Sequence, residues 1–396
     1  MNTNWTDPNF VIGSVATGNN FYLRNDIIEE IWAELKKGNS VLLAAPRRVG
    51  KTSIMQYMEQ NSIENYRLIF QNIQGVKSAN ELFERIYTML LSRLNTMDKA
   101  KKWVKKFLKS HKITKLGFPE IEFKTKPTDF AKEIELLLKD INNNQDVENI
   151  ILLLDELPEV LFNINKNEEN KEDAKIILKH LRHWRQQPEM NKKVKFVLAG
   201  SVGIHYVVDK IEKRNSDLND LRPVKFNPLS ENEAHKYIDW ATKSATITYT
   251  AELKQYLLDK IQYFVPFFIN LLLDEVNKQA KKGNNSNIRI QDIDIAFNTV
   301  VINNDHFKDW KKRLQDYMPK EDFDFVNEIL IHTAHKGYIS MQEIYDKAVK
   351  HNKTADYMDF INELEKDGYL TEFEDKYRFI SPFLSAFWRK NSPINL

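Results

Sequence analysis

One stretch of the chain constrains its fold more than any other feature. Ala45-Pro46-Arg47-Arg48-Val49-Gly50-Lys51-Thr52-Ser53 follows an apolar, β-rich run, Ser40–Ala45, and leads into a helical pattern, Ser53–Gln60. A glycine and a lysine in a loop between a strand and a helix are typical of a phosphate-binding loop. Backbone N–H groups at the start of the helix face an anion there, and a glycine lets the backbone approach it closely. The sequence therefore predicts a site for the phosphates of a nucleotide.

The side chains of this loop have separate expected roles. Lys51 is expected to place its charge between the β- and γ-phosphates, and the hydroxyl of Thr52 to ligate magnesium. Ala45 stands where the motif usually has its first glycine, which is a mild change because the strand end needs only a small residue there. The predicted phosphate-binding residues are Pro46, Arg47, Arg48, Val49, Gly50, Lys51, Thr52 and Ser53.

A second motif follows another apolar run. Ile150–Leu154 is followed directly by Asp155 and Glu156. Ligands of open α/β sheets bind outside the carboxyl ends of the strands, so Asp155 is predicted to hold the magnesium and Glu156 to orient or deprotonate the attacking water. Taken alone, the two acids could be a helix N-cap, and Gly-Lys-Thr could occur by chance. Both motifs in this order favour a nucleotide site that hydrolyses ATP.

Strand and helix patterns alternate through the first half of the chain. The predicted strands are Ser40–Ala45, Arg67–Ile73, Asn149–Leu154, Lys195–Ala199 and Val224–Phe226. The predicted helices between them are Ser53–Gln60, Ala79–Leu94, Asp129–Asn142, Ala174–Gln187 and Val202–Ile211. Such alternation is typical of a parallel sheet covered on both faces. We expect an α/β core with a five-stranded parallel sheet within residues 1–228.

Strand patterns stop after Pro228. Ser230 and Glu233 form a capping box, and helical patterns at Ala251–Tyr263, Pro266–Lys281 and Ile290–Val301 follow, so residues 229–304 are predicted to be an all-helical lid. Residues 305–396 predict a winged-helix domain. Its expected elements are the helices Phe323–His335, Met341–His351 and Tyr357–Asp367, the strand Tyr338–Ser340, and a hairpin of Tyr369–Glu372 and Tyr377–Ile380 that turns at Glu374 and Asp375.

Composition excludes several classes of function. The 396 residues include no cysteine, which rules out disulfides, thiolate nucleophiles and cysteine-ligated metal sites and fits a reducing compartment. No apolar run reaches the roughly 18 residues of a membrane span, and Met1–Phe10 lacks the layout of a secretory signal. The formal net charge is only +2, so nothing global indicates nucleic-acid binding. These features predict a cytoplasmic protein.

The motifs together resemble those of the archaeal-type ATPases, STAND-related members of the AAA+ superclass that also occur in bacteria. The similar segments are Phe21–Arg24, Pro46–Ser53, Leu152–Glu156 and Leu198–Ser201, and the resemblance extends to the lid and the winged helix. It implies ATP or ADP as the ligand and a central position for the strand that precedes the phosphate loop.

Several residue roles follow from this resemblance alone. Phe21, Tyr22 and Arg24 match the segment that lines the adenine pocket, and Ser201 matches the sensor of the γ-phosphate. Pro266 matches the lid proline near the base, although Phe264 replaces the glycine of that motif. Arg214 and Arg222 are equal candidates for an arginine finger, with surface arginines as the alternative. The lid helix carries no second sensor arginine, which favours a switch over a ring motor.

The distribution of charged residues indicates which kinds of partner the protein could bind. Lys99–Lys115 holds eight lysines and no acid, with Trp103 and Phe107 on one helix face. Such a segment could contact nucleic acid, an anionic membrane or an acidic partner, or it could pack its aromatic rings on the core. The predicted recognition helix, Tyr357–Asp367, is acidic, and residues 320–396 carry ten basic and fourteen acidic side chains. DNA affinity depends on neutralising phosphates, so this domain favours a protein contact.

The sequence leaves three functional hypotheses. The first is an ATPase that acts as a nucleotide-controlled switch for a protein partner or through self-association, in a defence or regulatory process. The second is a DNA-directed AAA+-type ATPase, loader- or transposition-like, with Lys99–Lys115 as its contact. The third is a nucleotide-bound scaffold with negligible hydrolysis. Two histidine pairs, His180/His183 and His332/His335, have helical spacing but no evident third metal ligand.

Overall fold

The computed structural model describes residues 5–95, 103–104, 129–200, 203–213, 216–303 and 305–392. The strands of its main sheet are β1 (Val41–Ala44), β2 (Tyr66–Asn72), β3 (Asn149–Asp155), β4 (Val194–Gly200) and β5 (Arg222–Pro223). They are parallel and lie in the order β2-β3-β4-β1-β5. The α/β class and the five-stranded parallel sheet expected from the sequence are confirmed.

The register of this sheet brings several strand ends to one edge. Ala44 at the end of β1 pairs with Gly200 at the end of β4, and Asp155 at the end of β3 pairs with Asn72 of β2. Because parallel strands all point the same way, the residues that follow β1, β3 and β4 leave the sheet at this edge.

Strand β5 lies two residues earlier than the apolar run that predicted it. Arg222 N–H donates to Ser40 O at 2.9 Å, and Val224 N–H donates to Leu42 O at 3.1 Å. Both Arg222 and Pro223 are exposed, as an edge strand permits. The prediction of Val224–Phe226 was therefore wrong, because pairing with β1, and not hydrophobicity, sets the position of this edge strand.

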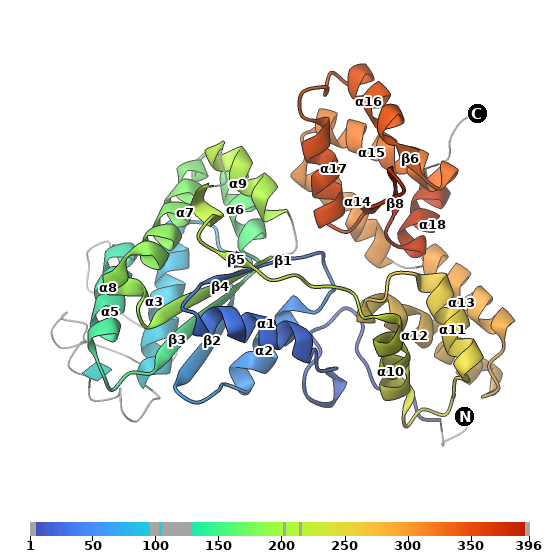
Figure 1. Cartoon of the computed structure of the whole chain (residues 1–396), viewed down its shortest axis with the longest axis horizontal. Coiled ribbons are helices and arrows are strands. Elements are labelled where there is room, and N and C mark those ends of the chain that lie inside the picture. Colours follow the sequence, from blue (N-terminus) through green and yellow to red (C-terminus); the bar gives the residue numbers. More distant parts are fainter. Residues whose placement is uncertain are drawn as a thin grey trace. The chain divides into compact units, whose positions relative to one another are not determined.

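Helices cover both faces of the sheet (Figure 1). They are α1 (Asn25–Lys36), α2 (Lys51–Gln60), α3 (Ala79–Asn95), α5 (Phe130–Asn143), α6 (Leu157–Lys166), α7 (Lys171–Gln186), α8 (Pro188–Asn191) and α9 (Ile204–Glu212), with a short 3-10 turn η2 (Ser216–Leu218). Helices α1 and α2 lie on one face, and α3, α5, α6 and α7 lie on the other. The core between the layers consists mostly of Leu, Ile and Val, and Ile150–Leu154 of β3 are completely buried.

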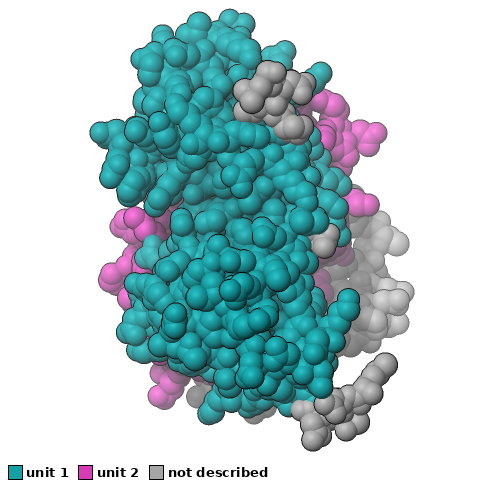
Figure 2. Space-filling model, turned by 90° about the vertical axis from the view of Figure 1, so that its right-hand side faces the viewer, with its two compact units in different colours: residues 1–23, 45–53, 226–396 teal, residues 24–44, 54–225 magenta. Residues whose placement is uncertain are grey.

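The chain divides into two compact units, which Figure 2 colours separately. Unit 2 comprises residues 24–44 and 54–225 and holds the sheet and its helices. Unit 1 comprises residues 1–23, 45–53 and 226–396, so the predicted phosphate loop belongs to it by its contacts.

The second half of the chain is mostly helical. After the 3-10 turn η1 (Gly18–Asn20), unit 1 contains α10 (Glu231–Thr242), α11 (Ala251–Ile261), α12 (Pro266–Gly283), α13 (Ile290–Asn303), α14 (Asp305–Tyr317), α15 (Lys320–Lys336), β6 (Ile339–Ser340), α16 (Met341–Lys350), α17 (Tyr357–Lys366), β7 (Leu370–Phe373), β8 (Lys376–Phe379) and α18 (Pro382–Asn391). The three short strands form an antiparallel sheet in the order β6-β8-β7. This is the helix–strand–helix–helix–hairpin order predicted for the C-terminal segment.

Local signals determine several of these boundaries. Ser230 Oγ accepts the N–H of Glu233 at 3.3 Å, and Glu233 Oε2 accepts the N–H of Ser230 at 2.9 Å, so the predicted capping box is present. Glu374 and Asp375 have φ values of 50° and 58°, as the predicted hairpin turn requires. Among the described residues, no helix combines the length and the apolar character needed to cross a membrane.

Unit 1 has a core of aromatic rings. Phe383 of α18 stacks on Phe297 of α13 at 4.5 Å between ring centroids, on Phe307 of α14 at 5.7 Å and on Phe268 of α12 at 5.8 Å. These rings come from both sides of residue 304, where the sequence predicts a boundary between the lid and the C-terminal domain. One shared core therefore joins the helices before and after that residue.

Candidate nucleotide site

The predicted phosphate loop is a turn with an unusual backbone. Arg48 and Gly50 have φ values of 66° and 99°, and a Cβ on Gly50 would meet nothing within 4 Å. Gly50 is therefore required by backbone conformation and not by crowding. Residues with positive φ inside a short loop turn successive N–H groups toward one side, which produces a concave anion-binding backbone. Helix α2 begins at Lys51, so its positive dipole end adds to this preference for an anion.

The ammonium group of Lys51 is held within the loop. Lys51 is only 6% exposed, and its Nζ donates to Ala45 O at 2.6 Å and to Pro46 O at 2.7 Å. The cation thus already lies among oxygen acceptors of the loop, and phosphate oxygens offer the same kind of partner with full negative charge. The lysine, the positive-φ loop and the helix N-terminus fit a polyphosphate.

The remaining residues of the loop differ in how deeply they are buried. Val49 is buried, whereas Pro46, Arg47 and Thr52 are half-buried. Ser53 is buried, and its hydroxyl accepts the N–H of Ala16 at 3.0 Å. This serine therefore fastens the segment before η1 to the start of α2.

The two predicted acids lie at the end of β3, in unit 2. Asp155 is 1% exposed, and its Oδ1 accepts the N–H of Glu156 at 3.1 Å. Glu156 has a φ of 67° and is the N-cap residue of α6. A positive φ at a non-glycine residue is costly and often marks a functional site. The backbone therefore turns sharply at the residue predicted to activate water.

A neighbouring glycine was not predicted to have a steric role. A Cβ on Gly200, at the end of β4, would lie 2.1 Å from Cδ of Pro158 in the first turn of α6. Only glycine lets β4 and the start of α6 approach this closely, so Gly200 helps to set the position of the turn at Glu156. Nothing in the local sequence around Gly200 reveals this contact, since Pro158 is distant along the chain.

The residues expected near adenine are divided between the two units. In unit 1, the ring of Tyr22 lies 5.0 Å from that of Tyr237 and 5.3 Å from that of Trp240, both on α10. Phe21 caps η1, where its N–H donates to Gly18 O at 3.2 Å. In unit 2, Arg24 is 7% exposed and forms two hydrogen bonds with Asp26, at 3.1 Å and 2.8 Å. Arg24 therefore has a carboxylate partner at the start of α1.

The other predicted residues are less fully described. Pro266 is the first residue of α12, and Arg222 lies exposed in β5. The carbonyl of Phe264, which replaces the glycine of the lid motif, accepts the N–H of Leu229 at 3.0 Å. Ser201 and Arg214 lie outside the described residues.

Polar side chains of α12 hold the N-terminal segment, which the sequence did not predict. Asn277 accepts from Trp5 Nε1 at 3.0 Å and donates to Asp7 at 2.8 Å. Asn270 accepts from the hydroxyl of Tyr237 at 2.7 Å and donates to Val11 O at 3.4 Å. Bonds from Lys281 and Asn277 lower the pKa of Asp7, and burial raises the pKa of Tyr237. Asparagine inside an apolar helical pattern is the one sequence signal that could have indicated these bonds.

The lysine-rich segment, Lys99–Lys115, lies outside the described residues except for Trp103 and Val104. Val104 is fully buried, and Trp103 packs against the aliphatic core of unit 2. This is the packing expected if aromatic residues of the segment attach it to the core.

Three of the four paired histidines lie near carboxylates, and Nε2 of the fourth, His335, lies 2.9 Å from Ser392 O. His180 and His183 lie 3.6 Å and 3.8 Å from Oε1 of Glu135, and His332 lies 3.2 Å from Glu343. Within the described ranges, no three side chains of His, Asp or Glu are grouped so that they could hold a metal ion.

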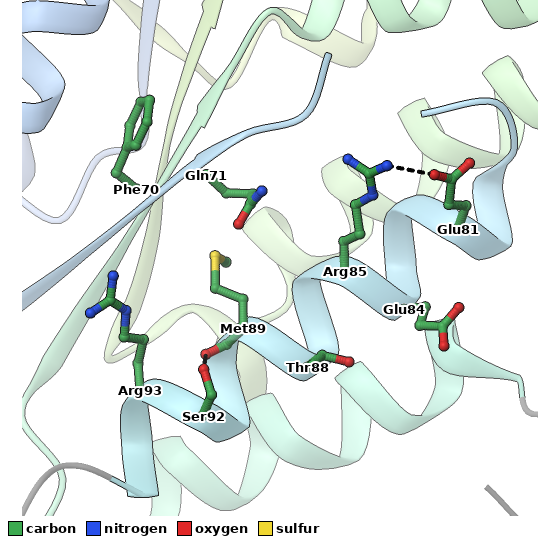
Figure 3. Close-up of a pocket in the computed structure, with 9 residues that line it drawn as sticks. All are labelled: Phe70, Gln71, Glu81, Glu84, Arg85, Thr88, Met89, Ser92 and Arg93. Atoms are coloured by element: carbon green, nitrogen blue, oxygen red, sulfur yellow. Dashed lines mark hydrogen bonds and ion pairs between the residues drawn. The ribbon is translucent and has the colours of Figure 1, made fainter. Parts of the chain in front are cut away.

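A pocket of about 670 Å³ lies beside the edge strand β2 (Figure 3). Its lining comes from β2 and α3 and consists of Phe70, Gln71, Glu81, Glu84, Arg85, Thr88, Met89, Ser92 and Arg93. Arg85 and Arg93 extend from α3, but Arg85 pairs with Glu81 at 2.6 Å and Arg93 pairs with Glu59 at 3.3 Å. None of the predicted nucleotide-site residues lines it.

Comparisons with known proteins support the fold. No family model matches the chain, and no curated protein does. Among solved structures, the Walker-type ATPase PABY2304 of Pyrococcus abyssi is similar, with a TM-score of 0.62 and 16% identity over 94% of this chain and 97% of that one. The ORC2 protein of Aeropyrum pernix, solved as ADPNP–ADP complexes, has a TM-score of 0.51 and 10% identity over 91% and 89% of the two chains. The chain therefore shares its overall α/β and helical fold with these two proteins.

Proposed function

We propose that the chain binds ATP with magnesium, hydrolyses it to ADP and phosphate, and uses the bound nucleotide as a switch for a protein partner. The observation that carries this proposal is the loop around Lys51. A buried lysine, two positive φ angles and a helix N-terminus occur together in residues 45–53. This combination favours a polyphosphate over other ligands.

The magnesium ligands would be the hydroxyl of Thr52 and the carboxylate of Asp155. Asp155 lies at the end of β3, at the sheet edge where Ala44 ends β1 and the phosphate loop begins. Magnesium, when bound, neutralises charge that develops on the transferring phosphoryl group. Lys51 and the N–H groups of the loop stabilise the same charge, and they are positioned before the reaction begins.

Glu156 is the proposed water-activating residue. Its carboxylate follows directly after Asp155, and its backbone is fixed at a φ of 67° between β3 and α6. The contact between Gly200 and Pro158 supports this turn from the other side. A general base must lie within hydrogen-bond reach of the water it activates, so rigid support of this turn favours catalysis.

The base is proposed to bind near the aromatic residues at the start of the lid. Tyr22 already packs edge-on against Tyr237 and Trp240, and flat rings of this kind suit a planar base. Phe21, Arg24 and Pro266 are further proposed contacts of the nucleotide, Ser201 is the proposed sensor of the γ-phosphate, and Arg214 or Arg222 is the proposed arginine finger.

The first test is ATP binding by Lys51→Ala, measured by calorimetry with magnesium. We expect affinity to fall at least about 100-fold, because a charge-assisted contact to phosphate is lost at a desolvated position. Lys282→Ala, an exposed lysine of α12, is the matched control and should bind as the wild type does. Equal affinity of Lys51→Ala and wild type would exclude this nucleotide site.

Turnover separates the ATPase from a nucleotide-bound scaffold. Glu156→Gln should bind ATP with unchanged affinity, while the rate of phosphate release falls by about 100-fold. A scaffold predicts no change in phosphate release. The DNA-directed alternative predicts that DNA raises turnover at low salt and that the effect disappears at high salt.

A further inference from the structure

Arg48, in the middle of the phosphate loop, contacts residues from the second half of the chain. Its guanidinium carbon lies 4.5 Å from the ring centroid of Phe267, the second residue of α12. Its Nη2 lies 4.0 Å from Oδ2 of Asp309 on α14. The Arg48 side chain is 19% exposed, and all three residues belong to unit 1.

Among the residues that the structure describes, Asp309 is the carboxylate whose charge acts on the guanidinium of Arg48. A Cβ on Gly13 would lie 3.9 Å from Nη1 of Arg48 and 3.3 Å from the ring of His306. The His306 ring packs edge-on against Phe267 at 5.5 Å. Burial, and then the charge of Arg48, lower the pKa of His306. The charge of Asp309 raises the pKa of Arg48, whereas burial, Arg47 and Arg313 lower it.

A second contact fastens the same loop. The turn after α17 approaches Pro46 so closely that a Cβ on Gly368 would lie 2.8 Å from Pro46 Cγ. Asp367 precedes this glycine, and burial together with Glu363 raises its pKa to about 8, whereas Arg313 and Lys51 oppose that rise. The loop is thus packed against α12, α14 and the α17–β7 turn.

We propose that Arg48 is a positioning residue that couples ATP binding at the phosphate loop to α14 through Asp309. A guanidinium presents its donors in one plane, and a phosphate and a carboxylate compete for that plane. A triphosphate that engages Arg48 weakens the contact with Asp309 and releases α14 from the loop. The inference rests on the proposed function, because it requires ATP to bind at this loop.

Thermodynamic reciprocity makes the coupling measurable. If ATP weakens the Arg48–Asp309 contact, then removing Asp309 must strengthen ATP binding by the same free energy. The Asp309 side chain is 55% exposed, so the contact is that of a partly solvated ion pair. The free energy of such a pair corresponds to a change of about two- to fivefold in ATP affinity when Asp309 is removed.

The experiment is a double-mutant cycle on ATP affinity, measured by calorimetry with the full chain. Asp309→Asn should bind ATP about two- to fivefold more tightly than the wild type. In the Arg48→Ala background the same substitution should have no effect. Asp316→Asn, an exposed carboxylate two turns further along α14, is the matched control and should leave affinity unchanged.

Hydrogen exchange gives an independent readout of α14. ATP should speed amide exchange of α14 in the wild type and should have no such effect in Asp309→Asn, where the helix is already released. Phe267→Leu, which removes the ring contact but retains apolar bulk, should tighten ATP binding in the same direction. Unchanged ATP affinity in both Asp309→Asn and Phe267→Leu would overturn the coupling. If Lys51→Ala still weakens ATP binding at least about 100-fold in that case, the nucleotide site stands and only the coupling fails.

Discussion

The two units are stabilised in different ways. Unit 2 is a parallel sheet whose core is mostly Leu, Ile and Val, with β3 buried on both faces. Unit 1 is held by stacked rings around Phe383 and by asparagine side chains of α12 that bind the N-terminal segment. In unit 2, aliphatic packing of helices on the sheet fixes the positions of the strand ends. In unit 1, a core of aromatic rings joins helices from several segments of the chain.

The predicted phosphate loop and the predicted acids belong to different units. In sequence the loop connects β1 with α2, but its side chains contact the N-terminal segment, α12, α14 and the α17–β7 turn. The predicted catalytic acids, by contrast, lie at the end of β3 in unit 2. The predicted phosphate loop therefore packs with the helices of unit 1, whereas the predicted acids are supported by the sheet of unit 2.

The largest loss of packing energy is expected from breaking the aromatic core. Phe383→Ala should lower the free energy of unfolding by about 4 kcal/mol, because it leaves a cavity between rings of α12, α13 and α14. Denaturant unfolding measures the loss, and hydrogen exchange locates it. Amides of unit 1 should lose protection while those of β3 and β4 retain it. Equal loss in both units would contradict the distinction between their cores.

A smaller loss is expected at the junction of β4 and α6 in unit 2. Gly200→Ala places a Cβ 2.1 Å from Pro158, so β4 and α6 must separate, at a cost of about 3 kcal/mol. Turnover should fall as well if Glu156 acts on water, since α6 begins next to it. Gly283→Ala is the control, because a Cβ there meets nothing within 4 Å. A fully stable Gly200→Ala protein would refute the close approach.

The pH dependence of stability tests the surroundings of Asp367, which lies in the turn between α17 and β7. Burial raises its pKa to about 8, so the folded state keeps a proton that the unfolded state loses near pH 4. The contribution of Asp367 to stability should therefore fall as pH rises from about 4 to about 8, with a slope of at most about 1.4 kcal/mol per pH unit. Asp367→Asn should remove this part of the pH dependence, measured by denaturant unfolding across that range. Asp359→Asn, which changes an exposed carboxylate of the preceding helix α17, should leave this pH dependence in place.

The smallest effect concerns the contact between α15 and α16. Burial raises the pKa of Glu328, but hydrogen bonds from His351, Lys350 and Lys347 outweigh it and lower the value to about 2. The resulting stabilisation is present above pH 4.5 and is lost as pH falls toward 2. Glu328→Gln should cost about 1 kcal/mol at pH 7 and nothing at pH 2 in thermal unfolding. A constant difference at both pH values would show that packing, and not charge, is responsible.

Much of the α/β core could be predicted because its signals are local. Five apolar residues before Asp155 must be a buried strand, and the spacing of Gly50, Lys51 and Thr52 after another strand predicts a phosphate loop. Helices α1, α6, α8, α14 and α18 were not predicted, and β5 was placed two residues too late. These elements depend on partners far along the chain, whose identity a local pattern does not contain.

The sequence by itself determined the parallel α/β core, the order of elements in the C-terminal segment and the two motifs at strand ends, because hydrophobic periodicity and backbone preference act over a few residues. The tertiary structure alone decided that Phe383 joins helices on both sides of residue 304, that Gly200 meets Pro158, and that Arg48 meets Phe267 and Asp309. Each of these contacts joins residues that are separated along the chain, and only the packing of complete elements brings them together.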